Sequence, residues 1–249
     1  MEKSCKFETT SFSLHIMAMA FMLCDHLWGT SVVSSDVFTC IGRLAFPIYA
    51  FLIVEGYFHT RSLKKYVKRL LLFAVISEIP FNLVMSGTPF YPLHQNVLWS
   101  FLISIGLIHW NEQVKEKQVW KRVLVGIATV SIAYIGGILT FVDYYHAGIF
   151  MVLVFWLFRG GKWWHYLGQL ICMWYINCEM LGGFGYVFEL FGTEHFVPRQ
   201  ALALLALIPI WLYRGRQGYH SRKLQWVYYG FYPAHLLILG MIGILGGRG

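Results

Sequence analysis

Long apolar segments recur along the whole chain and are separated by short polar stretches. Of the 249 residues, 57% are apolar and 13% are charged. A segment of about 20 apolar residues can cross the hydrocarbon core of a bilayer as a helix, because a helix satisfies its backbone hydrogen bonds internally. The sequence therefore predicts an all-α, polytopic integral membrane helix bundle that forms a single domain over residues 1–249.

The positions of the basic residues predict a topology. If the N-terminus is cytoplasmic, 17 of the 20 Lys and Arg residues fall in cytoplasmic segments, while Arg199 and Arg248 fall outside and Arg43 lies within a span. Cytoplasmic loops of membrane proteins are enriched in Lys and Arg, so we expect a cytoplasmic N-terminus and an extracytoplasmic C-terminus. The same bias explains the net charge of +8 without a nucleic-acid partner. The nine predicted transmembrane helices are residues 11–28, 39–59, 67–87, 95–110, 123–141, 144–158, 163–178, 197–213 and 226–246.

Two segments need a separate interpretation. The first apolar run, residues 11–28, is long for a secretion signal and carries Asp25 and His26, so we interpret it as a retained helix. Residues 179–195 are rich in glycine and aromatic residues but too short to span a membrane. We predict that they form an interfacial or re-entrant element on the extracytoplasmic side.

The patterns typical of metal and soluble cofactor sites are missing from the sequence. Its five cysteines are scattered and never form a CxxC pair, so we expect neither a disulfide framework nor a zinc site. Phosphate-binding loops, zinc-protease motifs and nucleophile elbows are also missing. We therefore predict no metal and look for chemistry among the polar residues inside the apolar segments.

Arg43 is the most unusual of these residues, because a charge inside an apolar span needs a partner or a ligand. Asp25 and His26 lie near the outer end of the first predicted helix, and Arg43 lies near the start of the second. At about 1.5 Å per residue, all three are expected at the same depth of a helical hairpin. We predict that Arg43 pairs with Asp25 and that His26 acts as a general base, since imidazole titrates near neutral pH. The alternatives are an ion pair that is only structural and a histidine that only donates to a backbone carbonyl.

Several further polar residues lie within the predicted spans. Glu55 and His59, and likewise Glu78 and Asn82, are spaced to meet one turn apart on a helix. Depth would allow His235 to reach Glu78. Hydrogen bonding between helices is the simpler interpretation for all of them. The residues that we predict to form a substrate-binding or structural polar network are Glu55, His59, Glu78, Asn82, Asn96, Asp143, Tyr144, Tyr232 and His235.

Five motifs resemble the TraX family, whose founding member acetylates the N-terminus of F pilin. In chain order they are MAMAFMLCDHLWG, GRLAFPIYAFLIVEGYFHTRSLKKYVKRLLLFAVISEIPFN, NVLWSFLISIGLI, DYYHAGI and YYGFYPAHLLIL. The resemblance covers most of the chain, and the block that begins at Gly42 is its most specific part. TraX proteins are similar in layout to multi-span acyltransferases that use a histidine and an arginine in early helices.

This resemblance implies an enzyme of the bacterial cytoplasmic (inner) membrane that transfers an acetyl or longer acyl group from acyl-CoA to an amine or hydroxyl. It implies His26 as the base and Arg43 as the positioning or oxyanion-binding group, with Asp25 beside them. We expect the CoA phosphates of the co-substrate acetyl-CoA to meet a basic loop on the cytoplasmic side, formed by Arg61, Lys64, Lys65 and Arg69. An acylated histidine would also be compatible with these residues.

Two other classes of function stay open from the residues alone. A proton-coupled transporter or channel would use the buried Asp25, Arg43, Glu78 and His235 as a path for protons or solutes. A structural partner in a secretion machine would need none of them. The expected partners are the lipid bilayer and a peptide or small-molecule acceptor, and the sequence does not specify an oligomeric state.

Overall fold

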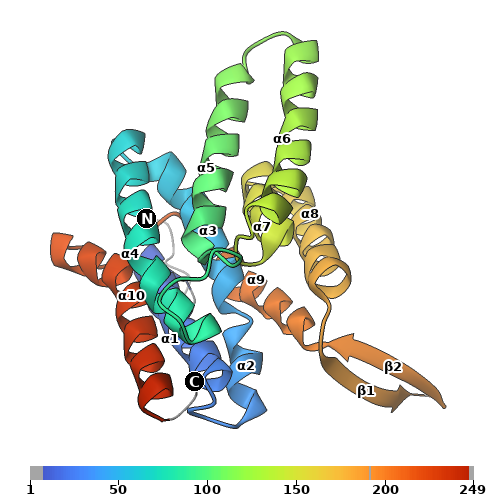
Figure 1. Ribbon diagram of the computed structural model, residues 1–249. Coiled ribbons are helices and arrows are strands. Elements are labelled where there is room, and N and C mark those ends of the chain that lie inside the picture. Colours follow the sequence, from blue (N-terminus) through green and yellow to red (C-terminus); the bar gives the residue numbers. More distant parts are fainter. Residues whose placement is uncertain (1–7, 191, 247–249) are drawn as a thin grey trace. The chain divides into compact units, whose positions relative to one another are not determined.

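The computed structural model describes residues 8–190 and 192–246 (Figure 1). The chain divides into two compact units, Met1–Leu52 with Gly160–Phe231 and Ile53–Arg159 with Tyr232–Gly249. Lys3, Lys6 and Arg248, which are among the basic residues that predict the topology, lie outside the described residues.

The predicted all-α class is confirmed, since helices make up most of the described chain. Four helical stretches are long and apolar enough to cross a membrane: Asp36–His59, Leu63–Ser86, Val119–Leu139 and Arg222–Leu245. The apolar helices Tyr145–Leu157 and Arg199–Trp211 are shorter. These helices are typical of a membrane protein.

The first unit contains a helical hairpin formed by α1 (Ser11–Gly29) and α2 (Asp36–Gly42). Thr10 caps the N-terminus of α1 by accepting a hydrogen bond from the backbone N–H of Ser13. The two helices touch closely, because a Cβ atom added to Gly42 would lie 2.4 Å from Cβ of Asp25. A glycine at this position is what allows α2 to approach the aspartate.

A break in the second predicted span places Arg43 at a helix junction. The prediction was one helix over residues 39–59, whereas the structure has α2, a turn at Arg43 and Leu44, and then α3 (Ala45–His59). Proline has no N–H, so Pro47 cannot donate to the carbonyl of Arg43 four residues earlier. The interruption therefore coincides with the arginine.

The rest of the first unit includes two irregular helices and a β-hairpin. Helix α8 (Trp163–Trp174) continues into the π-helix η1 (Tyr175–Leu181), and the 3₁₀-helix η2 (Arg199–Ala206) leads into α9 (Leu207–Trp211). Helix α10 (Arg222–Leu245) begins in this unit and ends in the second.

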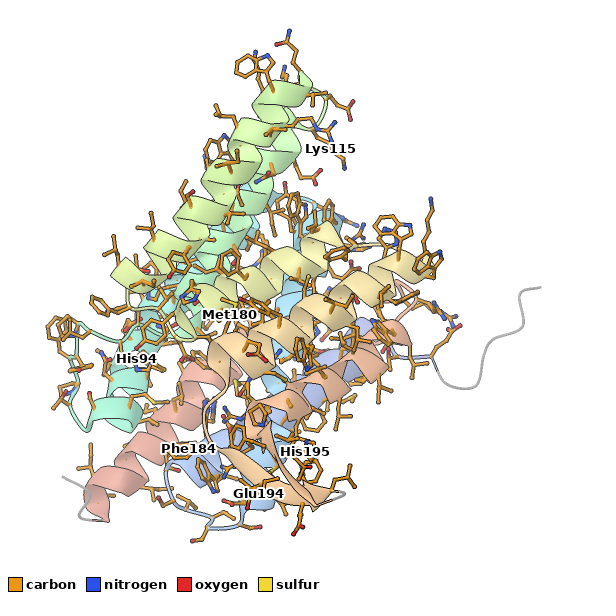
Figure 2. All side chains as sticks on the ribbon, turned by 90° about the vertical axis from the view of Figure 1, so that its right-hand side faces the viewer. His94, Lys115, Met180, Phe184, Glu194 and His195 are labelled. Atoms are coloured by element: carbon orange, nitrogen blue, oxygen red, sulfur yellow. The ribbon has the colours of Figure 1, made fainter. Side chains whose placement is uncertain are left out.

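Residues 179–195, for which an interfacial or re-entrant element is predicted, form the end of η1 and most of a β-hairpin. Strands β1 (Gly185–Leu190) and β2 (Thr193–Pro198) pair in antiparallel register, and Figure 2 shows Phe184, Glu194 and His195 on this hairpin. The turn residue Gly192 has φ +76°, a conformation that favours glycine. The predicted helix over residues 197–213 was wrong at its start, because Val197 and Pro198 belong to β2.

In the second unit, α5 (Val97–Val114) and α6 (Val119–Leu139) form an antiparallel hairpin (Figure 1). Helix α4 (Leu63–Ser86) precedes them, and α7 (Tyr145–Leu157) follows, with eight of the nine residues from 147 to 155 buried. The apolar side chains of α6 remain exposed, for example Ile127 at 61%. Such a surface is what a lipid-facing helix presents.

Candidate functional site

Asp25 and Arg43 meet across the α1–α2 hairpin. The guanidinium Nη2 of Arg43 donates to Oδ1 of Asp25, and the two side chains are 21% and 18% exposed. Thr39 is fully buried and its hydroxyl donates to the same Oδ1 at 2.9 Å. Arg43 Nε also donates to the backbone oxygen of Thr39 at 3.3 Å. The hairpin therefore holds a desolvated ion pair with a hydroxyl bridging its two members.

The sequence interpretation missed two amides that complete this cluster. Gln200, on η2, accepts from Arg43 Nη1 through Oε1 at 3.2 Å, and its Nε2 donates to Oδ1 of Asn177 at 3.0 Å. Asn177, on η1, donates in turn to the backbone oxygen of Met173 at 2.7 Å. Both amides are buried, at 7% and 0% exposure. Their polarity inside apolar segments was the available signal.

His26 lies in the last turns of α1 and is half-buried. Successive residues of a helix point about 100° apart, so His26 leaves α1 from a different face than Asp25 does. The structure thus brings Asp25 and Arg43 into contact and places His26 beside them along the helix.

Glu78 is bound by the start of α5 in the second unit. Its Oε1 accepts from Trp99 Nε1 at 2.6 Å, from the backbone N–H of Asn96 at 3.2 Å and from the Asn96 amide. The predicted pairing of Glu78 with Asn82 was wrong, because Asn96, the capping residue of α5, and Trp99 supply these donors instead. Oδ1 of Asn82 is buried and has no hydrogen-bond partner among the described residues.

Asp143 and Tyr144 form the turn between α6 and α7, and this turn is tied to the segment before α5. The backbone N–H of Asp143 donates to the oxygen of Gln95 at 2.8 Å, and its Oδ1 lies 3.4 Å from Nε2 of His94. His94 lies outside the predicted spans. Its pKa is raised, chiefly by the hydrogen bond to Asp143, although partial burial opposes the shift.

Helix α10 contributes Tyr232 and His235 to the second unit. Both are buried, at 7% and 5% exposure, and their rings lie 5.9 Å apart. Tyr232 lies near the backbone of Val97 and near Asp143 and Glu78. One polar region of the second unit therefore contains Glu78, Asn96, Asp143, Tyr144 and Tyr232.

Glu55 and His59 meet one turn apart on α3, as their spacing predicts. Nδ1 of His59 lies 3.5 Å from Oε2 of Glu55, and Nε of Arg159 lies 2.8 Å from Oε1. The Arg159 guanidinium also lies 4.4 Å from the ring of Phe58. Glu55 is 8% exposed, so this buried carboxylate is neutralised mainly by an arginine that the sequence interpretation did not assign to it.

The basic loop lies between α3 and α4 and in the first turns of α4. Arg61, Lys64 and Lys65 are exposed, while Arg69 is half-buried. Ser62 caps α4 by accepting from the backbone N–H of Lys65 at 3.4 Å. Positive side chains and a helix N-terminus meet here, which is an arrangement that favours anions.

No group of three or more His, Cys, Asp or Glu side chains that could hold a metal ion occurs within residues 8–190 and 192–246.

Comparison with known proteins gives one family match and one curated relative. A family model described as TraX protein matches residues 11–243. A probable fimbrial assembly protein, FimC of serogroup H1 from Dichelobacter nodosus, is 37% identical over 75 residues. That alignment covers 28% of this chain and 30% of the relative. No solved structure matches.

Proposed function

This chain belongs to the TraX family, and we propose that it is a membrane-embedded acyltransferase that moves an acetyl or longer acyl group from acyl-CoA to an amine. The observation that carries the proposal is the Asp25–Arg43 ion pair beside His26 in a hairpin of apolar helices. A buried pair of this kind is expensive to maintain in a membrane, and such residues often mark functional sites.

The proposed topology has nine transmembrane helices, a cytoplasmic N-terminus and an extracytoplasmic C-terminus in the bacterial inner membrane. The distribution of Lys and Arg supports this orientation. It places the α1–α2 hairpin near the outer face and the basic loop at the inner face.

In the proposed reaction, the acceptor amine attacks the thioester carbonyl while His26 accepts the amine proton. A C–N bond forms and the carbonyl oxygen gains the negative charge. Arg43 stabilises that charge, and Asp25, Thr39 and Gln200 keep the guanidinium in place. When the C–S bond breaks, the CoA thiolate leaves and takes up the proton from His26.

We propose that acyl-CoA docks with its phosphates against Arg61, Lys64, Lys65 and Arg69. Support comes from the joint presence of these side chains and the N-terminus of α4. The acceptor is proposed to be a peptide N-terminus such as that of a pilin-like subunit, which agrees with the relative whose name refers to fimbrial assembly.

Acetyl transfer by the full chain in lipid nanodiscs tests the proposal, with radiolabelled acetyl-CoA and a peptide that has a free N-terminus. General bases contribute about 100-fold to 10,000-fold to rate, so His26→Gln should lower kcat by at least about 100-fold. His220 is exposed in a loop, and His220→Gln is the matched control that should keep wild-type activity.

Two results would count against the proposal. Full transfer by His26→Gln protein would remove the histidine from the mechanism. A wild-type protein that binds no CoA but carries out proton-coupled uptake in liposomes would be a transporter, a class for which the buried Glu55 and the half-buried Glu78 are suited.

A further inference from the structure

Arg199 departs from the charge distribution of the rest of the chain. In the proposed topology it is the one Lys or Arg among the described residues that lies on the extracytoplasmic side. Its side chain is only 17% exposed, so it is not a solvated surface charge. An arginine that is both outside and largely buried requires a local reason.

Two aromatic rings lie against the Arg199 guanidinium. Its Cζ is 5.1 Å from the ring centre of Trp28, near the end of α1, and 5.8 Å from that of Tyr186, on β1. The base of the hairpin is fixed there, since the backbone N–H of Arg199 donates to the oxygen of Phe184 at 2.8 Å. When aromatic rings lie over a guanidinium, the donors that remain for recognition are those at its edges.

One edge of the Arg199 guanidinium has few hydrogen-bond acceptors. Nε of Arg199 is buried and has no hydrogen-bond acceptor among the described residues. Nη2, on the same edge, reaches Oδ2 of Asp36 at only 3.5 Å. The other Asp36 oxygen, Oδ1, accepts from Trp28 Nε1 at 3.1 Å, which holds the carboxylate to one side. Asp36 is therefore a weak occupant of the edge.

Arg43 is held differently. Its guanidinium donates to Asp25, to Gln200 and, through both Nε and Nη2, to Thr39. The Nε–Nη2 edge of an arginine is one that a planar carboxylate occupies through two parallel hydrogen bonds. At Arg199 this edge has the donors but lacks a well-placed acceptor.

We infer that Arg199 binds a carboxylate of the acyl acceptor. This carboxylate takes the place of the Asp36 carboxylate at the Nε–Nη2 edge of Arg199. Arg199 directly precedes Gln200, the residue that holds Arg43, so a bound acceptor lies beside the Asp25–Arg43 cluster. The acceptor class is an amine that carries a carboxylate close to the amine. The inference rests on the proposed function and topology, and the carboxylate can belong to an acidic side chain or to a chain end.

Binding of labelled peptides to the full chain in nanodiscs, without acyl-CoA, tests this site. The first probe has a free N-terminus, glutamate at its second position and an amidated C-terminus, and the second replaces this glutamate by glutamine. A third, Ala-Gln with a free C-terminus, separates a chain-end carboxylate from a side-chain one. We expect wild-type protein to bind at least one carboxylate probe about 10-fold more tightly than the neutral probe.

Variants of Arg199 and Asp36 should change the affinity for the carboxylate probe in opposite directions. Arg199→Gln should abolish the preference for the carboxylate. Arg199→Lys should keep only part of it, because lysine retains the charge but cannot form the bidentate pair. Asp36→Asn should tighten binding of the carboxylate probe, since it removes the competing carboxylate. Lys117→Gln, an exposed charge loss between α5 and α6, should change nothing.

Equal wild-type affinity for the three probes would overturn the inference. So would an Arg199→Gln protein that loses affinity for charged and neutral probes alike, because that would make Arg199 a support for the hairpin. If Arg199→Gln protein does not fold, Arg199→Lys and Asp36→Asn still decide the result. Because binding is measured without acyl-CoA, this outcome is separate from any failure of acetyl transfer.

Discussion

Gln200 connects the ion pair of the first hairpin to the irregular helices that follow α8. An amide has one acceptor end and one donor end, so its orientation decides whether it can serve an arginine. Asn177 uses its donor end on the oxygen of Met173 and thus offers Oδ1 to Gln200. Gln200 must then turn its own oxygen toward Arg43. The backbone of α8 thereby sets, through Asn177 on η1, the acceptor that Arg43 receives.

Replacing Gln200 by leucine tests this relay. The change removes the hydrogen bonds that Gln200 makes to Oδ1 of Asn177 and to Nη1 of Arg43, and each lost buried hydrogen bond costs about 1–3 kcal/mol. We expect a lower apparent Tm in detergent and loss of acetyl transfer. Gln217→Leu, at an exposed loop position, should leave both unchanged. Equal Tm values for the two variants would mean that the relay does not stabilise the cluster.

His94 and Asp143 predict a pH dependence of stability. The pKa of His94 is raised above its usual value of 6.5 by the hydrogen bond to Asp143. The folded state therefore binds the proton more tightly than the unfolded state. The stabilisation of the folded state by protonated His94 is complete below about pH 6. It is lost as pH rises through the pKa of His94 in the folded state. Apparent Tm should fall over this range in wild-type protein, and His94→Gln should remove that part of the fall. A variant with an unchanged pH profile would contradict the assignment.

At the scale of elements, the apolar pattern predicted the regular helices well and the irregular ones poorly. The predicted spans over residues 67–87 and 144–158 lie close to α4 and α7. Apolar length does not distinguish an α-helix from a 3₁₀-helix. The sequence therefore predicts a regular transmembrane helix where the structure has η2. The length of residues 179–195 argues against a transmembrane helix, but it does not distinguish a β-hairpin from another element that does not span the membrane.

The site was predictable to the same partial extent. Depth along a helical hairpin was sufficient to bring Asp25 to Arg43, because both belong to neighbouring helices. Gln200 lies 157 residues from Arg43 along the chain, and no local pattern reports such a contact. Arg159 beside Glu55 was missed for the same reason, at a separation of 104 residues.

Gly42→Ala tests whether the close contact between α1 and α2 is required. Its new Cβ would lie 2.4 Å from Cβ and 2.8 Å from Cα of Asp25, so α2 has to move away from α1. We expect a loss of about 2 kcal/mol or more, and weaker acetyl transfer because the ion pair is disturbed. The measurement is thermal unfolding of the purified protein together with the transfer assay.

Gly106→Ala is the matched control, since nothing lies within 4 Å of a Cβ atom at that position of α5. Alanine favours a helix over glycine by up to about 1 kcal/mol, so this variant should be as stable as wild-type protein or more so. If Gly42→Ala behaved in the same way, close contact of α1 and α2 would not be required.

At the scale of the whole molecule, the segments that connect the helices and strands differ in the charge of their side chains. The connection between α5 and α6 carries Lys115 and Lys117, whereas the tip of the β-hairpin carries Glu189 and Glu194 directly opposite each other. The proposed topology assigns the first segment to the cytoplasm and the second to the outer side, as the enrichment of Lys and Arg in cytoplasmic loops requires. It also requires the acyl donor and the acceptor to reach the protein from opposite faces.

Cysteine labelling in intact cells tests this arrangement. In a background where the native cysteines are replaced by serine, Glu194→Cys should react with a membrane-impermeant maleimide on intact spheroplasts. Lys117→Cys should react only after permeabilisation, and both residues are exposed, so accessibility within the protein does not limit either reaction. The reverse pattern would invert the topology, and it would place Arg199 and the β-hairpin on the same side of the membrane as acyl-CoA. Labelling of both cysteines in intact cells would instead mean that one of the intervening helices does not cross the membrane.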